Sequence, residues 1–345
     1  MIKNERCCEF IKKLPKAELH VHIEGTMEPS QLHLIAERNK IAIPPHTLDQ
    51  AGTSYLFTDI NSFVTAYMQA TQVLCKEQDF YDIMHAYLKK VAQQGVLHTE
   101  IFFDLQTYMP RGIAPEIIIN GMHRALVDGK KQFGISGALI MCFMRHLGVG
   151  DAFKALELLR GYNDKVIGVG LASVEKSNSL LLFQPVLAKA RAYGFHIVAH
   201  AGEQGAGDEA AIGEAITKLH LERIDHGIDC MRDVHLVKEL AQLRMPLTVC
   251  PLSNVVLGYV KKLEDHPLKA MFDAGLNISI NSDDPAFFGG YIGDNYCAAA
   301  TVLGFSCSEL VAVAHAAFEA SFLGQAGKDA CLAVLSDYVA DHSCK

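Results

Sequence analysis

The sequence predicts an α/β fold, a (β/α)8 TIM-type barrel with a helical insertion after strand one and extra C-terminal helices. Short apolar runs typical of buried strands recur eight times, and amphipathic helix-like segments separate most of them. The chain has 345 residues and is 50% hydrophobic, which is ample for one large core. It shows no linker, repeat or low-complexity segment, so we expect a single domain over residues 1–345.

The eight expected strands follow one another along the chain. They are "AELHVHI" (17–23), "VLHTEIFFD" (96–104), "ISGALIMCFM" (135–144), "VIGVGLA" (166–172), "HIVAHAG" (196–202), "RIDHG" (223–227), "PLTVCP" (246–251) and "NISINSDD" (277–284). Eight βαβ units favour a closed barrel over an open doubly wound sheet. The open sheet more often carries a glycine-rich phosphate loop after its first strand, and "IEGTMEP" is not such a loop.

Helices are expected between the strands and at both ends of the barrel. Those between strands are 114–133, 151–161, 180–193, 208–219 and 233–243. About seventy residues separate the first two strands and predict further helices near 28–40, 59–75 and 77–94. An insertion of this length on the functional side of a barrel is a natural lid. The C-terminal stretch 294–340 also has helical character.

Composition and charge exclude several classes of partner. The formal net charge is −8 and no extended Lys/Arg cluster occurs, which argues against a nucleic-acid partner. The longest apolar stretch is too short to cross a membrane. The ten cysteines are scattered without a C-x-x-C motif, and "MIKNERCCEF" has no secretory signal character. We expect a cytoplasmic protein whose cysteines are reduced. The sequence gives no indication of oligomeric state.

Polar residues gather at the C-terminal ends of four predicted strands, where barrels of this type build their sites. They are His20 and His22 on the first strand, His200 and Glu203 at the fifth, Asp225 and His226 at the sixth, and Asp283 and Asp284 at the eighth. Residues two apart in a strand share a face, so the first two imidazoles point the same way. A lone H-x-H is usually structural, and a single rim histidine or capping aspartate needs no function. Four converging strand ends are much harder to explain in that way.

The residue types indicate metal-assisted hydrolysis. The ligand types that zinc prefers are present in one set, which comprises His20, His22, His200 and a carboxylate. Such a set suits Zn²⁺ with one position left for water, whose pKa the metal lowers toward neutrality. His226 and Asp284 remain to orient or deprotonate that water. Glu203 lies three residues beyond His200, where a protonated carboxyl could donate a proton to a ring nitrogen of the substrate.

Five segments of the chain resemble the adenosine/adenine deaminase family of the amidohydrolase superfamily. They are "LPKAELHVHIEGT", "VAHAGE", "RIDHGI", "TVCPLSN" and "SINSDDPAFFGGY", and they occur in the family's order through nearly the whole chain. The resemblance implies a (β/α)8 hydrolase with one zinc ion per chain. It also implies a small-molecule aminopurine substrate, from which water removes the 6-amino group.

The resemblance also implies a role for each site residue. His20, His22, His200 and Asp283 match the zinc ligands, Glu203 the proton donor to purine N1, His226 the catalytic histidine, and Asp284 the carboxylate that contacts the water and purine N7. Ser173 stands where the adenosine branch has a glycine whose N–H meets the purine, although an ordinary loop serine is an equally good interpretation. Arg145, His146 and Arg111 are interpreted as rim or solvated loop residues.

Glu24, two residues beyond His22, favours adenine as the substrate. The adenosine branch resembles "H-x-D-G" here, and its shorter Asp bonds a ribose hydroxyl. We expect Glu24 to contact the substrate, and its extra methylene to push a carboxylate into the space of a ribose. "EIFFDLQTYMPRG" and "DDPAFFGGY" also resemble the adenine branch.

Three residues depart from the adenine branch. Leu105 and Tyr108 replace Pro and His of "DPQTH", and Ala172 replaces Asp of "LDSSE". If that Asp holds N3 or N9 of the base, Ala172 removes the contact and opens room for a larger N9 or N6 substituent. Adenosine or another adenine derivative is therefore the alternative substrate.

Two other classes of protein remain open from the sequence. A binuclear amidohydrolase would normally need a bridging lysine or glutamate at the end of strand four, which here reads "VIGVGLAS", with Lys176 well beyond it. A non-catalytic barrel with a structural metal would leave Glu203, His226 and Asp284 without a purpose.

Overall fold

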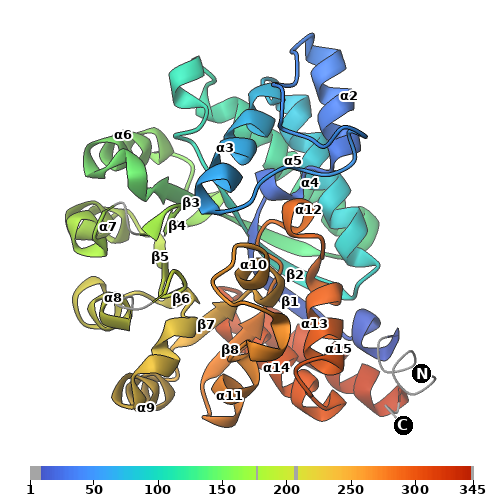
Figure 1. Ribbon diagram of the computed structural model, residues 1–345, viewed down its shortest axis with the longest axis vertical. Helices are drawn as coiled ribbons and strands as arrows, with labels where there is room; N and C mark the ends of the chain where they lie inside the picture. The colour runs from blue at the N-terminus through green and yellow to red at the C-terminus, as the bar shows by residue number, and fades with distance from the viewer. Residues whose placement is uncertain (1–8, 176–177, 206–208, 343–345) are drawn as a thin grey trace.

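The protein is a parallel eight-stranded barrel surrounded by helices (Figure 1). The computed structural model describes residues 9–175, 178–205 and 209–342. All eight expected strands are present and pair in chain order, each parallel to the next. They are β1 (Lys16–His22), β2 (Val96–Phe103), β3 (Ser136–Met144), β4 (Val166–Ala172), β5 (His196–Ala201), β6 (Arg223–His226), β7 (Pro246–Val249) and β8 (Asn277–Ile280). This topology confirms the predicted (β/α)8 barrel.

The barrel closes between β8 and β1 through the segment that follows β8. This strand ends at Ile280, earlier than the expected 284, because the chain then turns and Asp283 adopts a φ of 67°. The His22 N–H donates to the Asp283 carbonyl at 2.9 Å, and the Asp283 N–H donates to the His20 carbonyl at 3.1 Å. The Leu19 N–H also donates to Asn281 Oδ1 at 2.7 Å. These bonds hold Asp283 beside the two histidines of β1.

Outer helices follow most of the strands. They are α5 (Pro115–Phe133), α6 (Val149–Leu159), α7 (Gln184–Ala192), α8 (Glu209–Glu214), α9 (Val234–Leu243) and α11 (Leu268–Asp273). Helix α8 continues as a π-helical turn, Ala215–Leu219. The sequence did not predict α11, because six residues are too few to show a helical period. In Figure 1, α6 to α9 lie along one side of the barrel.

The long insertion after β1 forms three helices, as predicted. They are α2 (Pro29–Asn39), α3 (Ile60–Ala70) and α4 (Glu77–Ala92). Helix α4 packs along α5, on the outside of the barrel. Helix α3 instead reaches the mouth of the barrel, where Ile60, Phe63, Val64 and Tyr67 line a cavity. The insertion therefore supplies one wall of the candidate site.

The chain after β7 adds short helices at the mouth and long ones outside the barrel. They are α10 (Pro251–Val256), α12 (Pro285–Phe288), α13 (Ile292–Thr301), α14 (Cys307–Ala320) and α15 (Gln325–Asp341). Helix α14 packs against β1 and β8, where it covers the closing seam. The 3-10 turns are Glu24–Thr26, Thr71–Val73, Met109–Arg111, Arg145–Leu147, Leu180–Phe183, Ile228–Arg232 and Leu263–Asp265.

Two further expectations concern the membrane and the cysteines. Searching the described part of the chain reveals no helix with the length and apolar character that a membrane crossing needs. Six described cysteines are free thiols, namely Cys75, Cys142, Cys230, Cys250, Cys297 and Cys331. Cys307 is disulfide-bonded, which departs from the expectation that the cysteines are reduced.

Candidate active site

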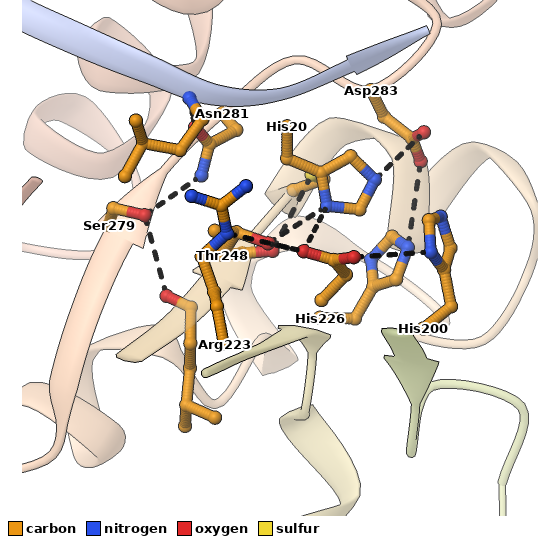
Figure 2. Close-up of polar contacts among 12 residues, drawn as sticks. His20, His200, Arg223, His226, Thr248, Ser279, Asn281 and Asp283 are labelled. Atoms are coloured by element: carbon orange, nitrogen blue, oxygen red, sulfur yellow. Dashed lines mark hydrogen bonds and ion pairs between the residues drawn. The ribbon is translucent and has the colours of Figure 1, made fainter. Parts of the chain in front are cut away.

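Four ligand-type side chains converge at the mouth of the barrel. His20, His22, His200 and Asp283 each offer one atom, and these atoms all lie within 4.8 Å of one another. The Nε2 atoms of His22 and His200 are 3.2 Å apart, and Asp283 Oδ1 lies 3.4 Å from His20 Nε2. Figure 2 shows His20, His200 and Asp283 directed toward one region. The set predicted from the sequence is thus brought together, although its residues lie more than 260 positions apart at the extremes.

Hydrogen bonds on the far side of His20 leave its Nε2 atom free to face the cluster. The Thr248 hydroxyl donates to Asp225 Oδ1 at 2.9 Å, so it accepts from His20 Nδ1, also at 2.9 Å. His20 Nε2 is buried without a hydrogen-bond partner, and in the neutral ring it is the nitrogen whose lone pair faces the cluster. Burial lowers the pKa of His22 to about 3, which keeps this ring neutral as well. Imidazole nitrogens and a carboxylate are the ligand types that a divalent metal ion such as zinc binds. For His200, burial lowers the pKa, but the hydrogen bond and charge of Asp225 outweigh it and raise the pKa overall.

Glu203 follows β5 and is held by an ordered chain of hydrogen bonds. The Leu268 N–H donates to His266 Nδ1 at 3.1 Å, so His266 Nε2 carries the proton and donates to Asn254 Oδ1 at 3.1 Å. The amide nitrogen of Asn254 therefore faces Glu203 and donates to its Oε2 at 3.2 Å. This arrangement occupies one oxygen of the Glu203 carboxyl and leaves the other to carry a proton.

The surroundings of Glu203 favour its protonated form. Burial raises the pKa of the Glu203 carboxyl well above its usual range, and the negative charges of Glu175 and Asp283 raise it further. A carboxyl whose pKa is raised in this way keeps its proton to a higher pH than an ordinary glutamate and can donate it to a substrate. The expectation of a protonated glutamate at this position is consistent with this environment.

His226 lies between Glu203 and the metal-type cluster, and Asp284 lines the same cavity. His226 Nδ1 is 3.3 Å from Glu203 Oε2, and His226 Nε2 is 3.9 Å from Asp283 Oδ2. Burial lowers the pKa of His226 well below its usual value, so the ring is a neutral base. Asp284 is 4% exposed, lines the cavity, and has an Oδ1 without a hydrogen-bond partner.

Gly25 makes room for the Asp284 carboxyl. A Cβ at position 25 would lie 1.9 Å from Asp284 Oδ1 and 2.5 Å from its Cγ, which is far inside van der Waals contact. Any larger residue at Gly25 must displace the carboxyl. The sequence reasoning did not single out Gly25, although it directly follows Glu24 in the first motif.

The site opens into a cavity that is lined by both polar and apolar side chains, as small-molecule sites usually are. Polar groups of the site lie at one end, and apolar side chains form most of the remaining wall. The lining residues outside the catalytic cluster are Ile60, Phe63, Val64, Tyr67, Asp104, Met144, Ala172, Ser173, Leu257 and Phe288. The cavity therefore suits a flat, mostly apolar molecule with polar atoms at its edges.

Glu24 lies behind this wall and does not project into the cavity. Its carboxylate accepts hydrogen bonds from the hydroxyls of Tyr67 at 3.1 Å and Tyr108 at 3.0 Å. It also accepts from the backbone N–H of Asp104 at 3.3 Å. Contrary to the expectation from the sequence, Glu24 does not line the cavity, and it instead bonds to Tyr67 and Asp104, which do.

The structure also places the residues that depart from the adenine branch. Tyr108 is fully buried and supplies one of the donors to Glu24, while Leu105 belongs to the hydrophobic core. Ala172 lines the cavity next to Ser173, which has a φ of 76° and whose hydroxyl lies 2.8 Å from His146 Nδ1.

The remaining basic residues near the site are structural. Arg145 is 3% exposed and donates to the Asn178 carbonyl, as expected for the rim. Arg111 is not a solvated loop residue: its guanidinium donates to the carbonyls of Gln72 at 2.8 Å and Thr71 at 3.2 Å. It thereby ties the loop after β2 to the insertion. Lys176 lies outside the described residues.

A barrel with this arrangement at the C-terminal ends of its strands defines the class of amidohydrolases, which use a bound metal to activate water. Within that class, the family model for adenosine deaminase matches residues 15–338, and the chain belongs to this family of hydrolytic aminohydrolases.

Relatives with established names are similar over nearly their full lengths. An adenine deaminase of Chlorobium phaeobacteroides is 46% identical over 330 residues, 96% of this chain and 98% of the relative. One of Crocosphaera subtropica is 47% identical over 320 residues, 93% of this chain and 98% of the relative. The crystal structure of adenine deaminase from Arthrobacter aurescens has a TM-score of 0.89 and 41% identity, covering 94% of this chain and 99% of that chain.

Proposed function

We propose that this protein hydrolyses adenine to hypoxanthine and ammonia with one zinc ion per chain. The observation that carries the proposal is that one cavity holds a buried carboxyl, Glu203, beside the cluster of three histidines and Asp283. Adenine deamination needs both a proton donor for the ring and an activated water. The names of relatives at 46% and 47% identity support adenine as the substrate.

The donor atoms of the cluster are of the types that zinc binds. The zinc ligands in this proposal are His20, His22, His200 and Asp283. Zinc bound there supplies a more acidic water and a positive charge that stabilises negative charge developing on oxygen. Asp225 lies on the side of His200 that faces away from the cluster. Its Oδ2 is 3.5 Å from His200 Nδ1 and orients that ring.

The protein groups around the cluster divide the proton transfers between them. His226 and Asp284 orient the attacking water and accept its proton. Glu203 gives its proton to N1 of the purine, which makes C6 more electrophilic as the C6–O bond forms. The proton taken from water then passes to the amino group, the C6–N bond breaks, and ammonia leaves. The second proton of the water leaves the oxygen as the C6 carbonyl forms and returns to Glu203, which restores the acid. Each group touches the cavity in which these steps occur.

A binuclear reaction is less well supported by the end of β4. Ala172 and Ser173 are the residues that this strand end contributes to the cavity, among those that the structure describes. Neither side chain can bridge two metal ions. The proposal of one zinc ion therefore agrees with the residues that face the cavity.

An ammonia-release panel tests the proposed function. The zinc-loaded protein is assayed with adenine, adenosine, deoxyadenosine, adenosine phosphates and N6-substituted adenines, with hypoxanthine identified by chromatography. We expect the highest kcat/KM for adenine. A higher value for adenosine or for an N6-substituted adenine would replace the substrate but keep the reaction. No ammonia from any aminopurine, with zinc fully loaded, would favour a non-catalytic barrel.

A further inference from the structure

Asp104 is a buried cavity residue that the proposed reaction does not use. It directly follows β2, is 4% exposed, and lines the same cavity as Glu203 and Asp284. Its Oδ1 has no hydrogen-bond partner. A buried carboxyl oxygen without a partner is costly, so its position is best explained if a ligand completes its hydrogen bonding.

The groups around Asp104 fix its backbone and favour a neutral side chain. Its N–H is bonded to Glu24, whose carboxylate also takes the hydroxyls of Tyr67 and Tyr108. Glu24 therefore accepts three hydrogen bonds, and none of them comes from the side chain of Asp104. Burial raises the pKa of the Asp104 carboxyl well above its usual range, and the Glu24 charge raises it further, although a hydrogen bond with Tyr67 opposes the shift. A neutral carboxyl offers one O–H donor and one carbonyl acceptor.

Free adenine has one edge with the complementary pattern. If Glu203 meets N1 and Asp284 meets N7, then C6 faces the metal-type cluster and the edge with N3 and N9 faces away from it. That edge carries an acceptor, N3, directly beside a donor, N9–H. A carboxylic acid can pair with both atoms at once, through O–H to N3 and from N9–H to its carbonyl oxygen. A substituent on N9 removes the donor and meets the wall that Tyr67 and Asp104 form.

We propose that Asp104 binds the N3/N9–H edge of the free base and is the residue that selects against N9-substituted purines. The inference rests on the proposed function for the orientation of the purine. Asp104 acts as a specificity residue and takes no part in bond breaking at C6. Its loss should therefore act more on KM than on kcat.

The test compares three Asp104 variants on matched substrates. Asp104→Asn keeps one donor and one acceptor, Asp104→Ala removes both, and Asp104→Leu removes both while retaining volume. Asp151→Asn, a partly exposed acid on α6, is the control for loss of a carboxyl. Each is assayed with adenine, 9-methyladenine and 3-deazaadenine. Zinc content and circular dichroism show that the variants remain folded and loaded.

We expect the wild type to prefer adenine over 9-methyladenine and 3-deazaadenine by about tenfold to a hundredfold in kcat/KM. Asp104→Ala and Asp104→Leu should lose about that factor for adenine, mainly through KM, and little for 9-methyladenine. Asp104→Asn should keep most of the preference. An unchanged preference in whichever of the Ala and Leu variants folds would overturn the inference. So would a wild type that accepts 9-methyladenine as readily as adenine.

A binding measurement separates this inference from the proposed function. Hypoxanthine and 9-methylhypoxanthine differ in the same N9–H, and calorimetry measures their Kd without turnover. If the wild type released no ammonia from adenine, the proposed function would fail. Tighter binding of hypoxanthine that depends on Asp104 would still support the inference, and equal binding of both ligands by the wild type would contradict it.

Discussion

At Glu203, burial and neighbouring charge create an acid from a residue that is normally ionised at pH 7. Glu203→Gln keeps the volume and the bond from Asn254 but cannot give up a proton. We expect kcat to fall by about 10² to 10⁴ with zinc content unchanged. Metal analysis on the same sample is the control. Wild-type turnover in the zinc-loaded variant would show that another group protonates N1.

The raised pKa of Glu203 also sets the direction of a pH dependence. The acid acts in its protonated form, which is present below its folded-state pKa and lost as pH rises through it. The pKa is raised, first by burial, so this loss falls well above the usual range of a glutamate. We expect kcat/KM for adenine to decline on the alkaline side of its pH profile. A decline that begins near pH 4 to 5, where an ordinary glutamate ionises, would contradict the protonated assignment.

Gly25 gives a residue-scale test of how closely Asp284 is positioned. Gly25→Ala places a methyl group where Asp284 Oδ1 now lies, so the carboxyl must move. A displacement of about 1 Å at a catalytic group can cost about a hundredfold in rate, and we expect a kcat loss of at least this size. Gly150→Ala is the matched control, because nothing lies within 4 Å of a Cβ there. Equal activity of both variants would show that Asp284 need not occupy its present position.

Residue types and strand-end positions predicted a cluster of three histidines and a carboxylate, and the family resemblance was needed to single out Asp283 as that carboxylate. The same rule extends to Asp104, which ends the second predicted strand and aligns with the Asp of "DPQTH", but the sequence analysis assigned no role to it. Glu24 was expected in the cavity and instead supports Tyr67 and Asp104 from behind. That difference depends on side-chain direction after a strand end, which periodicity does not determine.

At the scale of elements, α10 positions the acid of the site. Asn254 on this helix lies between His266 and Glu203 and directs its amide nitrogen to the carboxyl. We expect Asn254→Ala to lower kcat about fivefold, since one hydrogen bond contributes about 1 kcal/mol. The donor stabilises the ionised form of Glu203, so its removal should move the alkaline decline to higher pH.

Val256→Ala on the same helix is the control for Asn254→Ala, because this side chain is 41% exposed and lies outside the hydrogen-bonded chain. A kcat loss with an unmoved alkaline limb would indicate general disturbance of α10 and not a role in positioning Glu203. The sequence did not predict α10, α11 or α12, since helices of four to six residues are too short for a periodic pattern. The long insertion helices, by contrast, were predicted nearly to their ends.

At the scale of the whole molecule, a metal ion in the cluster would join β1, β5 and the segment after β8. Metal that binds the folded state stabilises it, by about 2.7 kcal/mol when free metal is 100 times Kd. We expect chelation to lower Tm and zinc to restore it. His20→Ala and Asp283→Ala should weaken metal binding, lower activity and remove most of this dependence. If neither chelator nor added zinc changed the Tm, that result would argue against a metal at this cluster.

The central claim is that this zinc-dependent barrel deaminates adenine in preference to its N9-substituted forms. The most direct test is kcat/KM for adenine and for adenosine on one preparation of known zinc content, with ammonia and product both quantified. We expect about one zinc ion per chain, equal amounts of ammonia and hypoxanthine from adenine, and a kcat/KM at least tenfold higher for adenine than for adenosine. Active protein without bound metal, or a higher kcat/KM for adenosine, would contradict it.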